Sequence, residues 1–325
     1  MKALLFLIAL AVSAHASTST IVEQHGLLRV VGNHVVGRDG HPVSLAGNSF
    51  FWSQWEGRWW NAECIEWLKK DWNTTIVRAA MGVEAGGYLQ HPEQHEALVE
   101  TVVNAATTAG LYVIIDWHDH HAERHEAAAI RFFQAMACKF GHQPNVIYEI
   151  YNEPLAVSWK DQVKPYAENV IAAIRAIDPD NLILVGSPHW SQDVDVAAAD
   201  PIKADNIAYT LHFYAGTHKA NLRAKAEKAL ESGVALVVSE WGTCNANGNG
   251  DVDAASTAEW IAFMQKWQLI HCNWAVSGKR EAASIVVPGA SATGGWKPSD
   301  LTASGRLVRQ TIRDWKSDAS KAAAE

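Results

Sequence analysis

Short apolar, β-branched runs alternate along the chain with stretches of helical periodicity. We read eight runs as strands, at 43–47, 75–80, 111–115, 146–150, 182–185, 207–211, 235–238 and 270–274. Helical stretches lie between them, at 63–71, 93–109, 123–140, 160–177, 220–232 and 254–267. This alternation is typical of βαβ units and a parallel sheet. Eight units, spaced by roughly 25 to 36 residues, predict an α/β fold, a closed (β/α)8 TIM barrel with its functional residues at the carboxyl ends of the strands.

The pattern also predicts how the barrel domain begins and ends. The segment 27–40 alternates weakly between apolar and polar residues and holds the turn signals Gly32-Asn33 and Asp39-Gly40. We therefore predict a short N-terminal β-hairpin that caps the floor of the barrel. A single domain at 17–316 is expected to carry the function, followed by a frayed tail at 317–325.

The first residues have the character of a secretory signal peptide. Residues 1–16 combine an early lysine, a short apolar core and an Ala14-x-Ala16 pattern. The alternative is a buried N-terminal strand or helix. No other segment contains the roughly 18 consecutive apolar residues that a membrane span requires. We expect a secreted, extracellular protein that acts as a monomer without a membrane partner.

Charge and cysteine content narrow the classes of ligand. The formal net charge is −8 and no Lys/Arg cluster is present, which argues against nucleic acid as a partner. The cysteines lack CxxC spacing, so a structural zinc site of that type is not expected. One or two disulfides are open possibilities, and their pairing cannot be deduced from sequence. The four cysteines are Cys64, Cys138, Cys244 and Cys272, and one glycosylation sequon begins at Asn73.

Polar and aromatic residues gather near the ends of the predicted strands. Any one of them alone has a structural explanation, such as a helix cap or a satisfied ion pair. Their joint occurrence at one end of a barrel is informative, because that end is where barrel active sites form. These residues are Arg78, His118, Asn152, Glu153, His212, Tyr214, Glu240 and Trp274.

Two of these residues, Glu153 and Glu240, would face one another across the barrel mouth. Paired carboxylates suit glycoside hydrolysis, in which one protonates the leaving oxygen and the other attacks or stabilises the anomeric centre. We expect Arg78 and the hydroxyl of Tyr214 to keep Glu240 ionised, and apolar neighbours to keep Glu153 protonated. His212 is expected to hydrogen-bond either Glu153 or the sugar on the reducing side.

The chain contains 15 tryptophans, and several fall in the predicted loops at the strand mouths. The apolar faces of sugar rings stack on exposed indole rings, so a row of tryptophans can hold a polysaccharide without using charge. We expect such a role for Trp55, Trp190 and Trp274, and less so for Trp52. The alternative for any tryptophan is packing in the core.

The segment 116–125 is rich in side chains that could bind a metal ion. His121 and His125 have the i,i+4 spacing that zinc sites use on one helix face. The segment lacks the HExxH motif, and histidine and aspartate at a helix start also serve as caps. From the sequence alone we therefore expect neither a metal ion nor another cofactor.

The chain resembles glycoside hydrolase family 5, and within it the endo-β-1,4-glucanases, from about residue 27 to residue 315. The resemblance rests on VRAA at 77–80, IDWH at 115–118, YEIYNEP at 148–154, TLHFY at 210–214, SEWG at 239–242 and NWAVSGK at 273–279. It implies Glu153 as acid/base and Glu240 as nucleophile. The pocket would be completed by Arg78, His118, Asn152, His212, Tyr214 and Trp274. Contacts to glucose units are implied for Trp55, Trp190, Lys279 and Glu281.

One position departs from the family pattern. Several members carry a histidine just after the first strand, where this chain has Phe51. No cellulose-binding module accompanies the domain, so the expected partner is a soluble or amorphous β-glucan. Because one fold serves many sugars, a β-mannanase, a xylanase or a mixed-linkage β-glucanase is an alternative. A carbohydrate-binding protein without catalysis is a further one.

Overall fold

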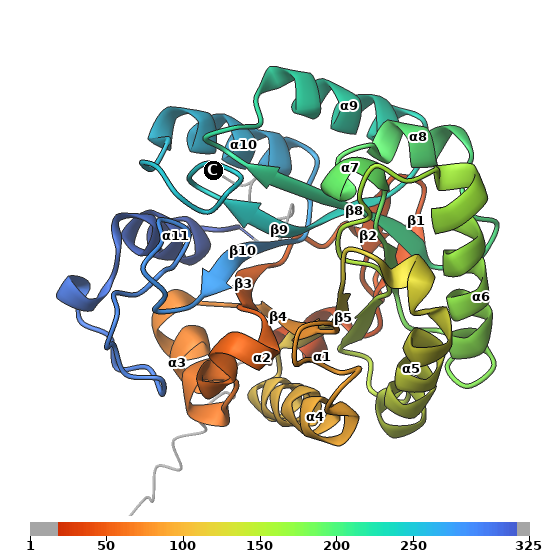
Figure 1. The fold of residues 1–325 in the computed structure, drawn as a ribbon. Coiled ribbons are helices and arrows are strands. Elements are labelled where there is room, and N and C mark those ends of the chain that lie inside the picture. Colours follow the sequence, from red (N-terminus) through yellow and green to blue (C-terminus); the bar gives the residue numbers. More distant parts are fainter. Residues whose placement is uncertain (1–18, 317–325) are drawn as a thin grey trace, which may run out of the picture.

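Eight parallel strands close into a barrel in the computed structural model, which describes residues 19–316 (Figure 1). Around the barrel their order is β10, β3, β4, β5, β6, β7, β8 and β9. The strands are β3 Ala46–Phe50, β4 Ile76–Gly82, β5 Tyr112–His118, β6 Val146–Glu149, β7 Ile183–Val185, β8 Ile207–Tyr214, β9 Leu236–Gly242 and β10 His271–Val276. The predicted (β/α)8 barrel is therefore confirmed. The predicted signal peptide at 1–16 and tail at 317–325 lie outside the described residues.

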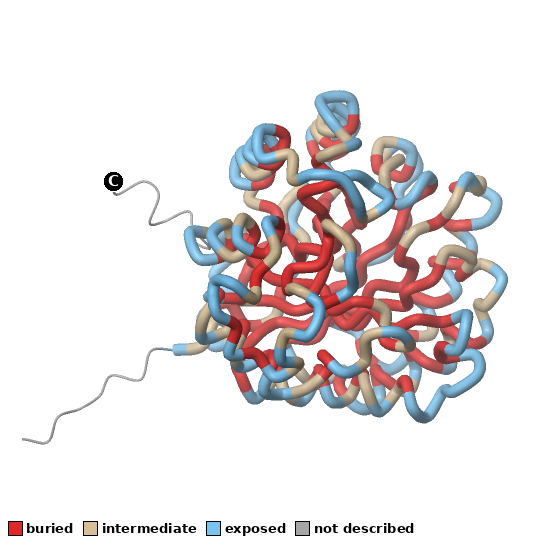
Figure 2. Tube along the Cα trace, turned by 60° about the vertical axis from the view of Figure 1, so that its left-hand side comes forward, coloured by how far each residue is buried: buried red, intermediate tan, exposed pale blue. Residues whose placement is uncertain are grey.

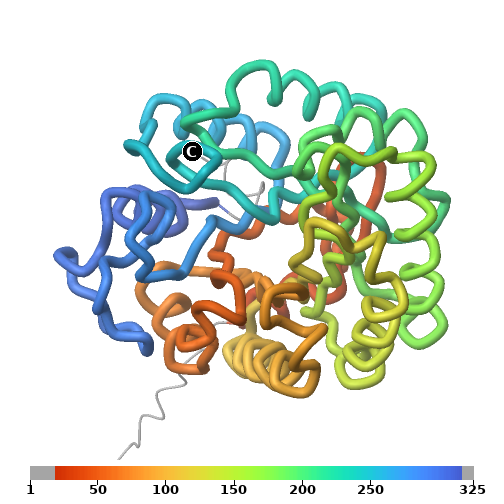
Figure 3. The backbone as a smooth tube through the Cα atoms, viewed as in Figure 1, coloured from red at the N-terminus to blue at the C-terminus, as the bar shows by residue number. Residues whose placement is uncertain are grey.

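Helices form an outer ring that follows the chain around the barrel (Figure 3). Each predicted helical stretch contains a helix, and several shorter helices lie in the connections. The principal helices are α3 Ala62–Trp72, α4 Pro92–Ala109, α5 Glu126–Phe140, α6 Lys164–Arg175, α9 Ala220–Glu231, α10 Ala254–Lys266 and α11 Ala303–Arg313. The shorter ones are α1 Ile21–His25, α2 Ser53–Glu56, η1 Gly57–Trp59, η2 Ala122–Arg124, η3 Trp159–Val163, α7 Pro188–Ser191, α8 Val194–Ala199 and η4 Pro298–Asp300.

Local sequence explains where these helices begin and end. Asn61 precedes α3, and its side chain accepts a hydrogen bond from the backbone N–H of Cys64, which satisfies a donor that the helix leaves free. Gly110 ends α4 with φ of 70°, a left-handed conformation that glycine adopts without strain. The ring is closed by Arg309 of α11, which donates two hydrogen bonds of 2.7 Å to Asp71 of α3.

The predicted N-terminal hairpin is also confirmed. Strands β1 Arg29–Val31 and β2 His34–Val36 pair antiparallel, and Gly32 at the turn has φ of 60°. Leu28 and Val35 belong to one buried apolar cluster with residues at the amino ends of the barrel strands, among them Ile76 and Tyr112. The hairpin thus covers the floor of the barrel and leaves the opposite mouth open.

Most of the buried chain is barrel strand or the inward face of a helix, whereas exposed segments lie on the outside (Figure 2). The largest apolar cluster fills the layer between strands and helices, as expected for parallel strands covered by helices. Glycine is needed where strands approach closely, because a Cβ at Gly47 would lie 1.6 Å from the carbonyl oxygen of Ile76. The barrel is consequently a rigid frame for whatever its mouth holds.

The strand boundaries correct one expectation. The predicted strands at 207–211 and 235–238 stop before His212, Tyr214 and Glu240, but these three residues lie within β8 and β9. Apolar runs stop at the first polar side chain, whereas the backbone ladder continues because these side chains pair with one another inside the barrel. The predicted strands therefore ended too early.

Two open questions from the sequence can be addressed. The cysteines Cys64, Cys138, Cys244 and Cys272 are all free thiols, so neither possible disulfide forms. Across residues 19–316, every helix is too short or too polar to cross a membrane.

Candidate active site

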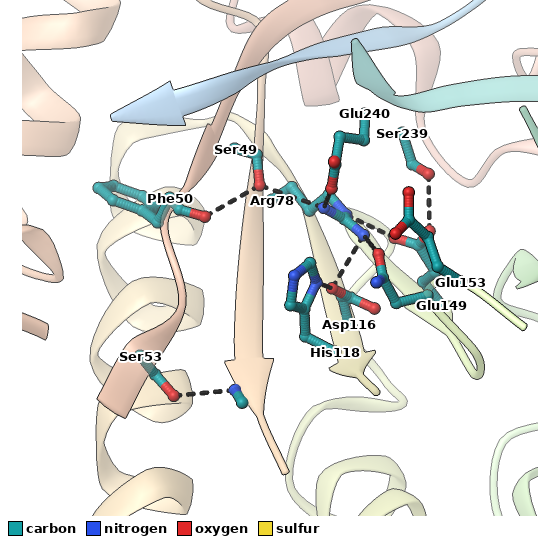
Figure 4. A network of polar contacts seen from close by, with 12 residues as sticks. Ser49, Phe50, Ser53, Arg78, Asp116, His118, Glu149, Glu153, Ser239 and Glu240 are labelled. Atoms are coloured by element: carbon teal, nitrogen blue, oxygen red, sulfur yellow. Dashed lines mark hydrogen bonds and ion pairs between the residues drawn. The ribbon is translucent and has the colours of Figure 1, made fainter. Parts of the chain in front are cut away.

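Arg78 lies at the centre of a buried polar network in the barrel mouth (Figure 4). Its side chain is fully buried, and its Nε donates to Glu149 Oε2 at 2.7 Å. Nη1 donates to Glu240 Oε2 at 3.0 Å, and Nη2 lies 2.9 Å from Asp116 Oδ2. The planar fork of a guanidinium can serve several carboxylates at fixed angles. Arg78 thereby holds together residues from strands β4, β5, β6 and β9.

The sequence analysis missed two of these carboxylates. Glu149 and Asp116 are fully buried within strands, and Glu149 also accepts a hydrogen bond of 2.6 Å from the hydroxyl of Ser239. A signal was available, because a carboxylate inside an apolar strand needs a counter-ion and Arg78 is a cation inside a neighbouring predicted strand. Both serve to position other groups, since neither reaches the open cavity.

Glu240 is held through both carboxylate oxygens. Tyr214 donates from its hydroxyl to Oε1 at 2.7 Å, and Arg78 donates to Oε2. Arg78 and Tyr214 were expected to keep Glu240 ionised; both contact it and both act to lower its pKa, but the pKa is raised on balance. Burial raises the pKa of Glu240, and the charge on Glu153 adds to this rise, while His212, Arg78 and Tyr214 act in the opposite direction.

Glu153 follows β6 and is contacted by two imidazoles. His212 Nδ1 lies 2.9 Å from Oε1, and His120 Nε2 lies 3.1 Å from Oε2. Burial raises the pKa of Glu153, but the hydrogen bonds and charges of the two histidines outweigh it and lower the pKa to about 2. The expectation that apolar neighbours keep Glu153 protonated is therefore wrong for the free site, because its immediate neighbours are polar. His120 was not singled out from the sequence.

The proton that the sequence analysis assigned to Glu153 is held by its partner His212. Burial lowers the pKa of His212, but the charge of Glu240 and hydrogen bonds with Glu149 and Glu153 raise it to about 9. Its Nε2 lies 3.0 Å from the hydroxyl of Ser239, which donates onward to Glu149. At neutral pH the pair of Glu153 and His212 thus carries one proton.

His118, the last residue of β5, forms part of one wall of the mouth. Its Nδ1 lies 2.6 Å from Asp116 Oδ2, and its ring stacks on Trp274 with centroids 5.0 Å apart. The edge of Trp52 packs against the same imidazole at 4.1 Å. Burial and the charge of Arg78 lower the pKa of His118 well below its ordinary value, so the imidazole is neutral.

Asn152 supplies a polar group that has no partner in the structure. Its Oδ1 accepts a hydrogen bond of 2.7 Å from Arg78, which fixes the amide orientation. The buried Nδ2 then lacks any hydrogen-bond acceptor. An unsatisfied buried donor is unusual in a native structure, and it marks a position where a ligand oxygen can bind.

A cavity of about 870 Å³ opens beside the two glutamates. Trp190 is 45% exposed at its edge, as expected for a sugar platform, and its backbone has φ of 57°. The cavity is lined by His120, Glu153, His189, Trp190, Gln192, Asp193, His212, Tyr214, His218, Lys225, Glu240, Ala246 and Asn247.

The other predicted sugar contacts lie outside the lining of this cavity. Trp55 is 56% exposed and packs on Phe51, whose ring also contacts Trp274 at a centroid distance of 5.1 Å. Lys279 lies 5.2 Å over the same phenyl ring and forms an ion pair of 2.6 Å with Glu281. Phe51 is therefore part of a buried apolar cluster that also contains Trp274.

The catalytic region offers one possible grouping of metal ligands. Glu153, His212 and Glu240 each present an atom within 4.8 Å of the others. Those atoms are already engaged by Arg78, Tyr214 and the histidines, so the arrangement is better explained by hydrogen bonding and proton transfer. A barrel mouth with two facing carboxylates and exposed tryptophans defines a site of the glycoside hydrolase class.

Comparison with known proteins identifies the family. The description cellulase (glycosyl hydrolase family 5) matches residues 36–280. Endoglucanase Z of Dickeya dadantii (strain 3937) is 54% identical over 301 residues, which make up 91% of this chain and 68% of that protein. An endoglucanase of Clostridium saccharobutylicum is 43% identical over 291 residues, 88% of this chain and 65% of that protein. The chain thus spans about two thirds of the length of these relatives.

Solved structures agree with this assignment. A structure from Cytophaga hutchinsonii is 53% identical with a TM-score of 0.90, covering 91% of this chain and 97% of that one. The catalytic domain of Thermobifida fusca endoglucanase Cel5A is 33% identical, with a TM-score of 0.88. The match covers 91% of this chain and 100% of that domain. The chain belongs to glycosyl hydrolase family 5 and is a glycoside hydrolase. Its resemblance to the endo-β-1,4-glucanases of that family is confirmed.

Proposed function

We propose that this protein is a secreted, retaining endo-β-1,4-glucanase that cleaves internal β-1,4-glucosidic bonds by double displacement. The observation that carries the mechanism is the separation of the carboxylates, since oxygen atoms of Glu153 and Glu240 lie within 4.8 Å of one another. Retaining enzymes hold the two carboxyl groups about 5 to 5.5 Å apart, whereas inverting enzymes need roughly 6.5 to 9.5 Å to admit a water molecule. Glu240 is the nucleophile and Glu153 the acid/base.

In the first step a carboxylate oxygen of Glu240 attacks the anomeric carbon, and the bond from that carbon to the leaving oxygen breaks. Glu153 delivers a proton to the leaving oxygen. The proton comes from the pair formed with His212, which passes it from Nδ1 to Glu153 as negative charge develops on the substrate. Arg78 and Tyr214 orient the attacking carboxylate by holding both of its oxygens.

In the second step Glu153 removes a proton from water, and the water oxygen bonds to the anomeric carbon. The ester bond to Glu240 then breaks, which restores the carboxylate. The proton returns to the pair of Glu153 and His212, so the site is ready for another turnover. Two inversions at the anomeric carbon leave the product in the β-configuration.

Binding of the glucan is assigned to the aromatic and polar groups around this pair. Trp190 and Trp55 are exposed and offer apolar faces to glucose rings, whereas Trp274 is only 6% exposed and stacks on His118. The free Nδ2 of Asn152 is suited to a sugar hydroxyl next to the cleavage point. Lys279 and Glu281 are expected to contact a further glucose unit, and His118 to line the pocket.

Relatives support β-glucan as the substrate. The two relatives described above are named endoglucanases, and a variant of the Thermobifida fusca enzyme, 32% identical to this chain, has been solved in complex with cellotetraose. Secretion is proposed from the character of residues 1–16. The domain is proposed to act as a monomer on soluble or amorphous β-glucan.

The stereochemistry of the first product tests the mechanism. Proton NMR during hydrolysis of a cello-oligosaccharide should show the β-anomer first, before mutarotation. Initial appearance of the α-anomer would contradict double displacement. A parallel panel of carboxymethylcellulose, mixed-linkage β-glucan, β-mannan and xylan tests the substrate, and preference for mannan or xylan would overturn the glucanase assignment in favour of the alternatives.

Two matched variants test the roles of the carboxylates. Glu153→Gln should lose activity on cellulose yet still release a dinitrophenolate leaving group from an aryl cellobioside, because that group departs without protonation. Glu240→Gln should lose both activities while it still binds oligosaccharide. Glu227→Gln, on the surface of α9, is the control for loss of a carboxylate. Full turnover by Glu240→Gln would contradict the assignment of Glu240 as nucleophile.

A further inference from the structure

The proposed function gives roles to only some residues of the histidine-rich segment at 116–125. His120 contacts Glu153, and Asp116 and His118 belong to the Arg78 network. His121 and His125 point elsewhere, toward Glu84 in the connection between β4 and α4. Glu84, Asp119 and His121 each present a ligand atom within 4.8 Å of the others.

The separations within this cluster are those of metal ligands. His121 Nδ1 lies 3.5 Å from Glu84 Oε2, and His125 Nε2 lies 3.6 Å from Glu84 Oε1. Both distances exceed the roughly 2.7 to 3.2 Å of an N–H···O hydrogen bond. The His121–Glu84 distance of 3.5 Å is close to the edge of a tetrahedral zinc site, about 3.3 to 3.4 Å for zinc–ligand bonds of about 2.0 to 2.1 Å.

Asp119 is the anchor of the cluster. Its side chain is 1% exposed, and its Oδ1 accepts a hydrogen bond of 2.9 Å from the backbone N–H of His121. His125 Nδ1 lies 2.7 Å from Asp119 Oδ2, so the imidazole and the carboxylate orient one another. Ligands in metal sites are commonly held by such outer hydrogen bonds. Glu84 is 48% exposed, and its carboxylate already faces His121 and His125.

We propose that Glu84, Asp119 and His121 form a binding site for Zn²⁺, with water as fourth ligand and His125 as the outer hydrogen-bonding partner of Asp119. This inference reverses the expectation of no metal ion. It also replaces the suggested helix face, because His121 precedes η2 and His125 precedes α5. The ligands come instead from two loops at the same rim of the barrel.

The ion would tie the loop after β4 to the loop after β5. The second loop carries His120, and the backbone carbonyl of Asp119 accepts a hydrogen bond from the N–H of Glu153 at 3.3 Å. The site therefore braces the loop that contacts the acid/base residue, without supplying a ligand to the substrate. Its presence or absence does not decide the hydrolytic mechanism.

The test uses untagged protein freed of metal with a chelator and then titrated with zinc chloride by calorimetry. Wild type should bind one Zn²⁺, and His121→Ala and Glu84→Gln should weaken binding at least tenfold. His125→Ala should weaken it about tenfold to a hundredfold, as losses of outer partners do. His142→Ala removes an exposed histidine elsewhere and should leave binding unchanged. Equal affinity in wild type, His121→Ala and Glu84→Gln would overturn the proposal.

Anomalous diffraction at the zinc edge locates the ion independently. A peak between Glu84 and His121 is expected in crystals soaked with zinc chloride. A peak only between Glu153 and Glu240, or no peak, would overturn the site. The melting midpoint provides a third readout, because zinc should raise it in wild type and not in His121→Ala.

Discussion

Removal of the Arg78 guanidinium should destabilise the protein in a way that depends on pH. In Arg78→Met the fully buried Glu149 and Asp116, together with Glu240, lose their shared counter-ion. Breaking a buried ion pair by removing one partner costs about 3 to 5 kcal/mol. We expect a loss in this range at pH 7, because the methionine fills much of the volume but leaves three carboxylates facing one another.

The pH dependence separates electrostatics from packing. A carboxylate that is protonated in the folded variant and ionised in the unfolded chain takes up a proton on folding. The free energy of unfolding then rises by about 1.4 kcal/mol for each pH unit of acidification per such carboxylate. Between pH 7 and pH 5 the deficit of Arg78→Met relative to wild type should shrink by about 2 to 3 kcal/mol if one carboxylate neutralises.

Urea unfolding followed by tryptophan fluorescence at both pH values measures this deficit. Arg309→Met is the matched control, since Arg309 also forms a bidentate pair, with Asp71, but is 28% exposed. Its loss should stay near or below about 1 kcal/mol at either pH. An equal deficit for Arg78→Met at pH 5 and pH 7 would refute the electrostatic account and leave lost packing as the cause.

Further expectations follow from individual contacts. Because the pKa of His212 is raised to about 9, its contribution to stability is complete below its ordinary value of 6.5 and is lost as the pH rises through 9. The alkaline limb of kcat/KM should lie near pH 9, and an unchanged limb in His212→Gln would contradict the shared proton. Trp190→Ala should raise KM for soluble cellulose about tenfold, about 1.4 kcal/mol, with kcat and melting midpoint retained; an unchanged KM would exclude the platform role. Gly47→Ala should cost about 3 kcal/mol or more in urea unfolding, because its Cβ meets the carbonyl oxygen of Ile76. Four thiols should react with Ellman's reagent after denaturation and only Cys138 before it, whereas fewer than four would indicate a disulfide.

Some features of the site were readable from residue order because they depend on spacing along a strand. Glu153 and Glu240 were found since each follows or ends an apolar run, and such runs mark barrel strands. Glu149 was missed because it lies inside a run that was read only as strand. A carboxylate inside a buried strand is a signal for a counter-ion, and for Glu149 that counter-ion is Arg78 of another predicted strand.

The protonation state of Glu153 could not be predicted from the sequence, for a different reason. The pKa of Glu153 depends on His212, which approaches it from β8, and on His120, which approaches it from the loop after β5. Their distances of 2.9 and 3.1 Å to the carboxylate are properties of the closed barrel, and a change of an ångström or two would alter the balance with burial. Along the chain Glu153 is flanked by Asn152 and by apolar residues, so its neighbours in sequence carry no sign of the two histidines.

The sequence by itself determined the alternation of strands and helices, the hairpin at the floor, the two facing carboxylates and the tryptophans around them. These follow from the periodicity of side chains, which acts over a few residues. Only the tertiary structure decided that Arg78 joins carboxylates from three other strands, that His212 holds the proton of Glu153, and that Glu84 meets His121. Those contacts exist because barrel closure brings together side chains far apart in the chain, where burial makes each charge depend on its neighbours.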